Sequence, residues 1–134
     1  MPLFVDTSAI LAVMNADDEF HSSARKAWAE ALSGEAPLVV TNYILVETVA
    51  LLQARVGIEA VALFENDVLP VFDIRWVDEA THRTAMAMLL AAGRRRLSLV
   101  DCASFECMRR SGIQRAFTFD PHFREQGFEI VPSR

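Results

Sequence analysis

The segment Leu3-Phe4-Val5-Asp6-Thr7-Ser8 places a carboxylate directly after a short apolar run. Such a run predicts a strand that is buried on both faces, which is typical of a parallel sheet covered by helices. The same pattern returns late in the chain as Ala116-Phe117-Thr118-Phe119-Asp120. Sites in open α/β sheets form beyond the carboxyl ends of the strands. We therefore expect Asp6 and Asp120 to lie at that edge of the sheet.

Between these two segments, short apolar stretches alternate with stretches of helical spacing. Asn42 and Asp78 are placed to cap two helices. Gly93 is placed to end a helix, and Pro70 to end another. The alternation predicts an α/β fold, a three-layer α/β/α sandwich with a central, mainly parallel sheet, formed by residues 1–134 as a single domain. We expect strands at residues 2–5, 37–40, 71–77, 115–119 and 128–131, helices at 8–15, 21–32, 42–56, 59–69, 78–92 and 101–111, and a turn at 121–124.

The composition narrows the class of protein. Hydrophobic residues make up 52% of the 134 residues, which excludes a disordered chain. Charged residues or proline interrupt each apolar run, and the start lacks the features of a secretory signal, so we expect a cytoplasmic protein without a membrane span. The net charge of −5 argues against a general nucleic-acid binder. Arginines nevertheless flank Asp101, at Arg94-Arg95-Arg96 and Arg109-Arg110, and bound metal ions would offset part of the acidic charge.

Two further carboxylates lie in apolar surroundings. Glu47 interrupts an apolar run in a predicted helix, and Asp101 follows Leu97-Ser98-Leu99-Val100. Burying an ionised carboxylate without a partner is costly. Taken singly, Asp6 and Asp101 are explained as helix N-caps, and Asp120 as the start of a turn. Taken together, the four carboxylates would make a site for a hard divalent metal ion.

In the order and spacing of these motifs, the chain resembles the PIN-domain family, and within it the small ribonuclease toxins of the VapC type. The resemblance extends from Phe4 to Val131. It implies an acidic quartet that binds Mg²⁺ or Mn²⁺, a threonine that supports the quartet, and a pair of hydroxyl residues after the first aspartate. It also implies a homodimer and a small antitoxin that occupies the active-site groove. On this resemblance the quartet is Asp6, Glu47, Asp101 and Asp120, the threonine is Thr118, and the hydroxyl pair is Thr7 and Ser8.

The expected chemistry is metal-assisted hydrolysis of an RNA phosphodiester. Metal ions held by carboxylates can activate a water molecule and offset charge at the phosphate. We expect Asp6, Asp101 and Asp120 to be the principal ligands. Glu47 would complete the shell, directly or through water, or orient the attacking water. Without metal the crowded carboxylates repel one another, so at least one should have a raised pKa. The run Arg94-Arg95-Arg96 is a candidate for holding the RNA backbone.

Three other functions are less consistent with these residues. A phosphatase with an aspartyl nucleophile would need a second carboxylate two residues after Asp6, where the chain has Ser8. A PIN-like module that only binds RNA or a protein would not need the intact quartet. A receiver-type signalling domain would need a lysine late in the chain, and the only lysine is Lys26.

Several residues that often carry chemistry are given structural roles. The histidines show no metal-ligand spacing, and we expect His122 at the surface, with contact to substrate as the alternative. Trp28 and Trp76 are expected to pack in the core. Cys102 and Cys107 lie five residues apart, which favours helix packing over a disulfide or a metal clip.

Overall fold

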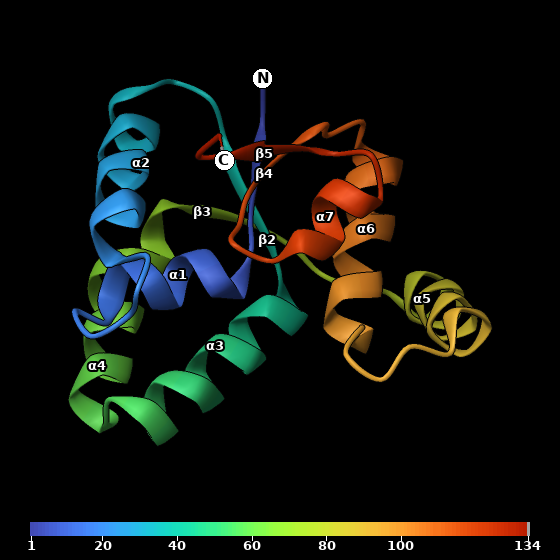
Figure 1. Ribbon diagram of the computed structural model, residues 1–134, viewed down its shortest axis with the longest axis horizontal. Coiled ribbons are helices and arrows are strands. Elements are labelled where there is room, and N and C mark those ends of the chain that lie inside the picture. The colour runs from blue at the N-terminus through green and yellow to red at the C-terminus, as the bar shows by residue number, and fades with distance from the viewer. Residues whose placement is uncertain (134) are drawn as a thin grey trace.

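A computed structural model describes residues 1–133, which form a five-stranded sheet in which each strand runs parallel to its neighbours. The strand order is β3-β2-β1-β4-β5 (Figure 1). Leu3 pairs with Leu38 on one side and with Arg115 on the other, so the first strand lies at the centre, where all three of its residues are buried. The strands are β1 (Leu3–Val5), β2 (Leu38–Thr41), β3 (Phe72–Arg75), β4 (Arg115–Phe117) and β5 (Glu129–Val131).

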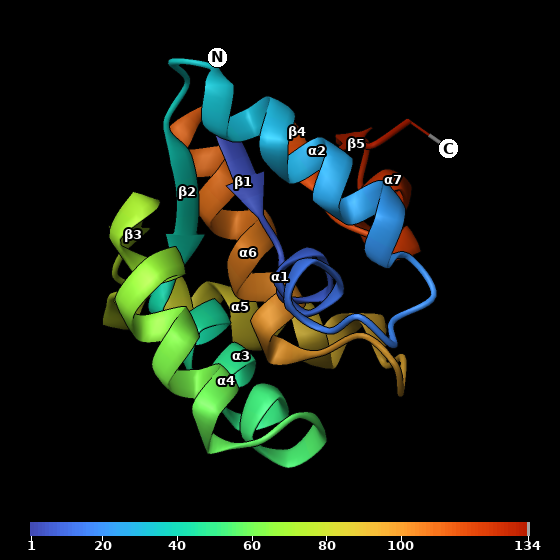
Figure 2. The ribbon, with the colours of Figure 1, turned by 90° about the vertical axis from the view of Figure 1, so that its left-hand side faces the viewer.

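Helices cover both faces of the sheet, which confirms the predicted three-layer α/β/α sandwich. Figure 1 shows α1, α2 and α4 on one side and α5, α6 and α7 on the other, while α3 runs below the carboxyl edge of the sheet. In Figure 2 the helix α2 crosses in front of the sheet and α6 lies behind it. Within residues 1–133, no helix has the length and apolar character to cross a membrane. The helices are α1 (Thr7–Met14), α2 (His21–Ser33), α3 (Asn42–Arg55), α4 (Ile58–Leu63), α5 (Glu79–Ala92), α6 (Leu99–Ser111) and α7 (Pro121–Glu125).

The direction in which the chain adds strands reverses after β3. Strands β2 and β3 extend the sheet on one side of β1, and the chain then returns to add β4 and β5 on the other side. The carboxyl ends of β1 and β4 are therefore neighbours, and the backbone N–H of Asp6 donates to the carbonyl of Phe117 at 3.0 Å. The helices that follow these two strands leave toward opposite faces (Figure 1). Such a reversal opens a crevice at the strand ends, which is where open α/β sheets bind ligands.

An aromatic cluster holds the short helix α7 against the sheet. The ring centre of Phe123 in α7 lies 5.0 Å from that of Phe105 in α6 and 6.2 Å from that of Phe4 in β1. All three side chains are fully buried, and each such burial contributes about 2–3 kcal/mol. A helix of five residues would not form alone in water. Its position therefore depends on this packing, and so does the position of the residues at its start.

Two helices are capped by residues other than those predicted. Thr41, not Asn42, caps α3, because its Oγ1 accepts from the backbone N–H of Ile44 at 3.2 Å. The amide oxygen of Asn42 instead accepts from the N–H of Val77 at 2.7 Å and holds the loop that leads to α5. Ser98 caps α6, three residues before Asp101. In both cases the capping residue lies earlier in the chain than the residue predicted to cap the helix. The cap at Asp78 and the left-handed turn after α5 agree with the prediction.

The segment between α3 and α5 differs most from the sequence-based prediction. The helix expected over 59–69 is α-helical only through Leu63, widens to a π-helical turn over Phe64–Val68 and tightens to a 3₁₀ turn over Leu69–Val71. The π-helical turn places Phe64 in the core, and Pro70 lies inside the 3₁₀ turn instead of ending a helix. The following strand, β3, covers Phe72–Arg75 and is shorter at both ends than the predicted 71–77.

The predicted positions of the tryptophans and cysteines are only partly confirmed. Trp28 packs edge-on against Phe72, with ring centres 5.9 Å apart, as expected. Trp76 lies beyond the shortened strand and is 72% exposed, so its predicted core position is wrong. Cys102 and Cys107 are free and buried in α6, in agreement with a packing role. Residues 121–124, predicted as a turn, belong to α7.

Candidate active site

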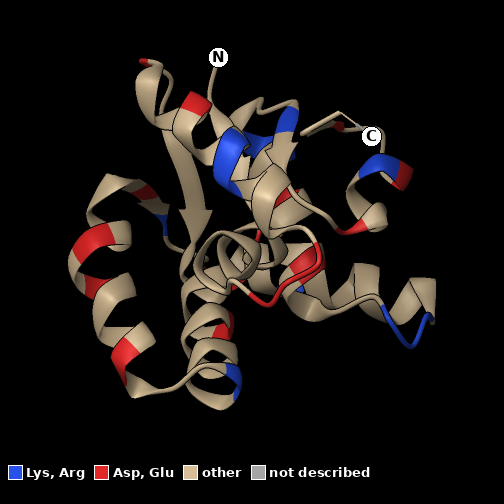
Figure 3. Ribbon diagram, turned by 60° about the vertical axis from the view of Figure 1, so that its left-hand side comes forward, with Lys and Arg blue, Asp and Glu red and all other residues tan. Residues whose placement is uncertain are grey.

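A cavity of about 630 Å³ opens at the carboxyl edge of the sheet, at the point where the strand order reverses. Asp6 follows β1, Glu47 comes from α3, Asp101 lies in the first turn of α6, and Asp120 precedes α7; all four line this cavity. Figure 3 shows acidic segments from several elements meeting there, with two basic segments, the end of α3 and the loop before α6, beside them. The fold therefore brings together the four carboxylates that are far apart in the sequence.

Asp6 is the most deeply buried of the four, with 3% of its surface exposed. Its Oδ2 accepts hydrogen bonds from the hydroxyl groups of Ser8 at 2.7 Å and Thr118 at 2.9 Å. Burial raises the pKa of Asp6 to about 7 from 3.8; the two hydroxyl donors lower it, and the nearby charges of Asp101 and Asp120 raise it further. The expectation that crowding in the metal-free site raises a carboxylate pKa is met here, although loss of water is the larger cause.

Thr118 and Ser8 link the ends of the two central strands. Their hydroxyl oxygens lie 3.3 Å apart, and both face Asp6. Ser8 Oγ accepts from the backbone N–H of Phe119 at 3.0 Å, and Thr118 Oγ1 accepts from that of Asp120 at 3.0 Å. Thr118 is fully buried and does not line the cavity. Its contacts are those of a residue that positions Asp6 and the backbone of Asp120.

Asp101 combines a structural role with a place in the cavity. It is the third residue of α6 and forms a capping box with Ser98: its Oδ2 accepts from the Ser98 N–H at 3.1 Å, and its own N–H donates to Ser98 Oγ at 3.0 Å. Burial raises the pKa of Asp101, and the charge of Asp120 acts in the same direction. The capping role that the sequence allowed for this residue therefore coexists with its position beside the other carboxylates.

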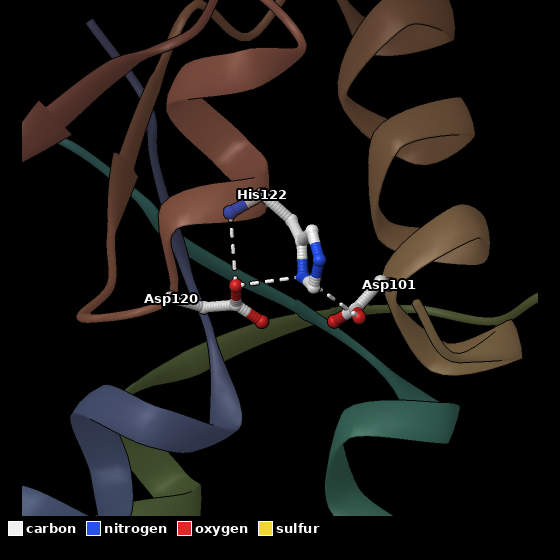
Figure 4. Close-up of side chains that lie close together, drawn as sticks. All are labelled: Asp101, Asp120 and His122. Carbon is white, nitrogen blue, oxygen red and sulfur yellow. Dashed lines mark hydrogen bonds and ion pairs between the residues drawn. The ribbon is translucent and has the colours of Figure 1, made fainter. Parts of the chain in front are cut away.

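His122 lies between Asp101 and Asp120 (Figure 4), so the predicted surface position is wrong. Only 9% of its surface is exposed. Its Nδ1 lies 2.8 Å from Asp120 Oδ1 and 3.8 Å from Asp101 Oδ2. The ring is turned inward because Asp120 caps α7, accepting the backbone N–H of His122 at 2.9 Å, and Pro121 starts the helix. The Asp-Pro pair at a helix start was the available signal for this turn.

Two carboxylates that line the cavity, Asp101 and Asp120, form a tight group of ligand atoms with His122, which does not itself line the cavity. Among the described residues, Asp101, Asp120 and His122 form the group whose ligand atoms all lie within 4.8 Å of one another. Asp6 and the half-buried Glu47 line the same cavity outside this group. The donor set is dominated by carboxylate oxygens, which suits a divalent cation.

Three charged residues that line the cavity, Asp18, Glu19 and Arg55, were not anticipated from the sequence. Asp18 and Glu19 come from the loop between α1 and α2, and Arg55 and Arg96 stand on its rim. Arg55 was detectable, since Glu47, Leu51 and Arg55 recur every four residues along α3 and all face the cavity. Of the predicted arginine run only Arg96 lines the cavity, and Arg94 forms an ion pair with Glu125 at 3.1 Å.

The raised pKa of Asp6 makes stability depend on pH. The folded protein holds this proton more tightly than the unfolded chain, so the free energy of unfolding is largest at low pH and falls as the pH rises from about 4 to about 7. In EDTA, urea unfolding at pH 5 and pH 8 should differ by about 2–4 kcal/mol. Asp6→Asn, which cannot ionise, should lose most of this difference and be the more stable protein at pH 8. An unchanged pH dependence in Asp6→Asn would contradict this assignment.

Comparison with known proteins agrees with the architecture. The sequence profile of the PIN domain matches residues 3–129. The 23S rRNA-specific endonuclease VapC20 of Mycobacterium tuberculosis is 38% identical over 133 residues, which cover 97% of this chain and 98% of that protein. The crystal structure of VapC20, a Sarcin-Ricin loop cleaving toxin, matches with a TM-score of 0.84 and 35% identity over 94% of this chain and 95% of that one. FitAcB from Neisseria gonorrhoeae shares the fold at a TM-score of 0.67 and 15% identity, over 96% of this chain and 95% of that one. The chain belongs to the PIN domain family.

Proposed function

We propose that the protein is a metal-dependent endoribonuclease and the toxin of a type II toxin–antitoxin pair. The observation that carries this proposal is the acidic cavity at the reversal of strand order, in a chain that is 38% identical over nearly its full length to a 23S rRNA-specific endonuclease. The substrate we infer is RNA, with 23S ribosomal RNA as the first candidate because VapC20 acts on it. Cleavage of such a substrate would take place in the cytoplasm.

The residues around the cavity suit Mg²⁺ or Mn²⁺, the ions implied by the family. Asp6 is buried, its pKa is raised, and no cationic side chain forms an ion pair with it among the described residues. Asp101 and Asp120 would hold the ion, with Asp6 and Glu47 completing its surroundings directly or through water. When bound, the ion supplies a water of lowered pKa and offsets charge at the phosphate.

The protein side chains would prepare the reaction in three ways. The hydroxyl groups of Ser8 and Thr118 hold the Asp6 carboxylate in one orientation, so it needs little rearrangement on binding. Glu47, which lines the cavity from α3, would accept a hydrogen bond from the attacking water. Arg55 and Arg96 on the rim would bind phosphates on either side of the scissile bond.

The rival functions are less well supported. In the phosphatase alternative, the residue two positions after Asp6 would act as an acid or base, but Ser8 donates its hydroxyl to Asp6 and accepts from Phe119. A module that only binds RNA or protein would have no need to bury Asp6 at the cost that its raised pKa indicates. We therefore favour catalysis over binding alone.

The catalytic proposal is tested by matched Asp→Asn changes. RNA cleavage should require Mg²⁺ or Mn²⁺ and stop in EDTA. Asp101→Asn should lower the cleavage rate by at least about 100-fold, because losing a ligand costs more than the 10–100-fold typical of outer-shell changes. Asp73→Asn, which alters an exposed ion pair on β3, should leave the rate unchanged. Cleavage in EDTA would rule out the metal mechanism, and hydrolysis of a phosphomonoester without RNA cleavage would favour the phosphatase.

If Arg55 and Arg96 bind RNA phosphates, they should contribute to the salt dependence of RNA affinity. RNA binding is measured in the Asp101→Asn background, so that the substrate stays intact. Arg55→Gln and Arg96→Gln should each reduce the slope of log affinity against log salt by about 0.7, the value for one phosphate contact on a single strand. Arg94→Gln is the control from the same loop, because Arg94 is paired with Glu125 outside the cavity. Equal slopes in all three variants would remove the rim arginines from RNA binding.

The partners we infer are a second copy of the chain and a small antitoxin. Large apolar side chains are more than half exposed on two helices: Val46 on α3, and Ile58 and Leu63 on α4. An assembly would cover such residues. Light scattering should give twice the 15.0 kDa mass of one chain. Where a short reading frame adjoins the gene, co-expression of its product should suppress RNA cleavage. A monomer at high concentration would contradict the homodimer, and undiminished cleavage after co-purification would contradict the antitoxin.

A further inference from the structure

The imidazole of His122 has a nitrogen that the protein itself does not satisfy. Nδ1 is inaccessible to solvent and has no hydrogen-bond partner in the structure. It nevertheless faces two carboxylates, at 2.8 Å from Asp120 Oδ1 and 3.8 Å from Asp101 Oδ2 (Figure 4). Buried polar atoms almost always have a partner, and one without a partner calls for an explanation.

Neither protonation state of Nδ1 gives this atom a hydrogen bond within the protein. If Nδ1 carries a proton, the ring forms an ion pair with Asp120 Oδ1 at 2.8 Å but no hydrogen bond, and that oxygen also accepts the backbone N–H of His122 at 2.9 Å. If Nδ1 is unprotonated, its lone pair faces the negative oxygens of Asp120 and Asp101. A cation bound between Nδ1 and the two carboxylate oxygens would resolve this. Unprotonated Nδ1 and both oxygens would then each direct a lone pair toward a positive charge.

The spacing of the three residues fits a shared ion. Ligand atoms around one divalent ion, with bonds of about 2.1 Å, lie about 3 Å apart when adjacent and about 4 Å apart when opposite. The separations of 2.8 and 3.8 Å between Nδ1 and the two carboxylates, in a group that spans at most 4.8 Å, are close to those values. The group comes from two elements, α6 and the start of α7, that the aromatic cluster holds together.

We propose that His122 Nδ1 is a direct metal ligand beside Asp101 and Asp120, and that it makes the site prefer a transition-metal ion such as Mn²⁺ over Mg²⁺. Mg²⁺ takes oxygen ligands almost without exception, whereas imidazole nitrogen is a common ligand for first-row transition metals. This inference rests on the proposed metal site but extends beyond the acidic quartet, which contains oxygen ligands only.

The experiment uses Mn²⁺ itself as the probe, on the full-length protein without RNA. Pulsed electron paramagnetic resonance of bound Mn²⁺ should show coupling to a directly bonded nitrogen. In His122→Asn the amide oxygen replaces Nδ1 at nearly the same place, so the nitrogen coupling should vanish. Titration should show that the ratio of Mn²⁺ to Mg²⁺ affinity falls by at least about tenfold in this variant, in line with the loss expected for a metal-site residue. His82→Asn is the matched control and should keep both properties, because His82 lies on α5 and contacts Tyr43.

Each outcome separates the possible roles. Mn²⁺ that binds without nitrogen coupling in the unaltered protein overturns the inference and leaves the ribonuclease proposal intact, and this measurement does not depend on whether a variant folds. Equal weakening of Mn²⁺ and Mg²⁺ in His122→Asn also overturns it, because a residue that only positions Asp120 would affect both ions alike. Nitrogen coupling without RNA cleavage supports His122 as a metal ligand and contradicts the proposed ribonuclease function. Absence of any Mn²⁺ binding overturns both.

Discussion

The carboxylate of Asp6 is held inside the protein by two hydroxyl groups, and the rest of the site is arranged around this contact. Ser8 follows Asp6 at the end of β1, whereas Thr118 comes from the end of β4, more than a hundred residues later. The two donors join the central strands at the point where the strand order reverses. Because the carboxylate is cut off from water, its pKa is raised. Ionising Asp6 therefore costs free energy, and a cation at this edge of the sheet would offset that cost.

The other carboxylates are positioned by ordinary features of helix starts. Asp101 closes a capping box with Ser98, and Asp120 caps the first turn of α7. A helix N-terminus favours a nearby negative charge, so each aspartate is stabilised by the backbone that orients it. The aromatic contacts of Phe123 with Phe4 and Phe105 hold α7 against the sheet and against α6. The distances within the acidic group consequently depend on hydrophobic packing several ångströms away from the cavity.

The fold class and the four carboxylates were predictable because their signals are local. Short apolar runs followed by an aspartate indicate parallel strands, and Asp78 and Gly93 mark the ends of a helix by their own backbone chemistry. The predictions failed where neighbours far away in the sequence decide the outcome. Trp76 is exposed because β3 stops one residue before it, after a π-helical turn that places Phe64 in the core. Asn42 does not cap α3, because its side chain is engaged by Val77 in another loop.

The sequence by itself therefore determined the layers, the parallel sheet and which acidic residues stand at the strand ends, since periodicity and turn chemistry depend on adjacent residues. Only the tertiary structure decided the membership and spacing of the site. It turned His122 inward between Asp101 and Asp120, left Glu47 outside that tight group and brought Arg55 and Arg96 to the rim. The physical reason is that distances between elements are set by core packing and by the order of strands in the sheet. Neither is visible in a local pattern of residues.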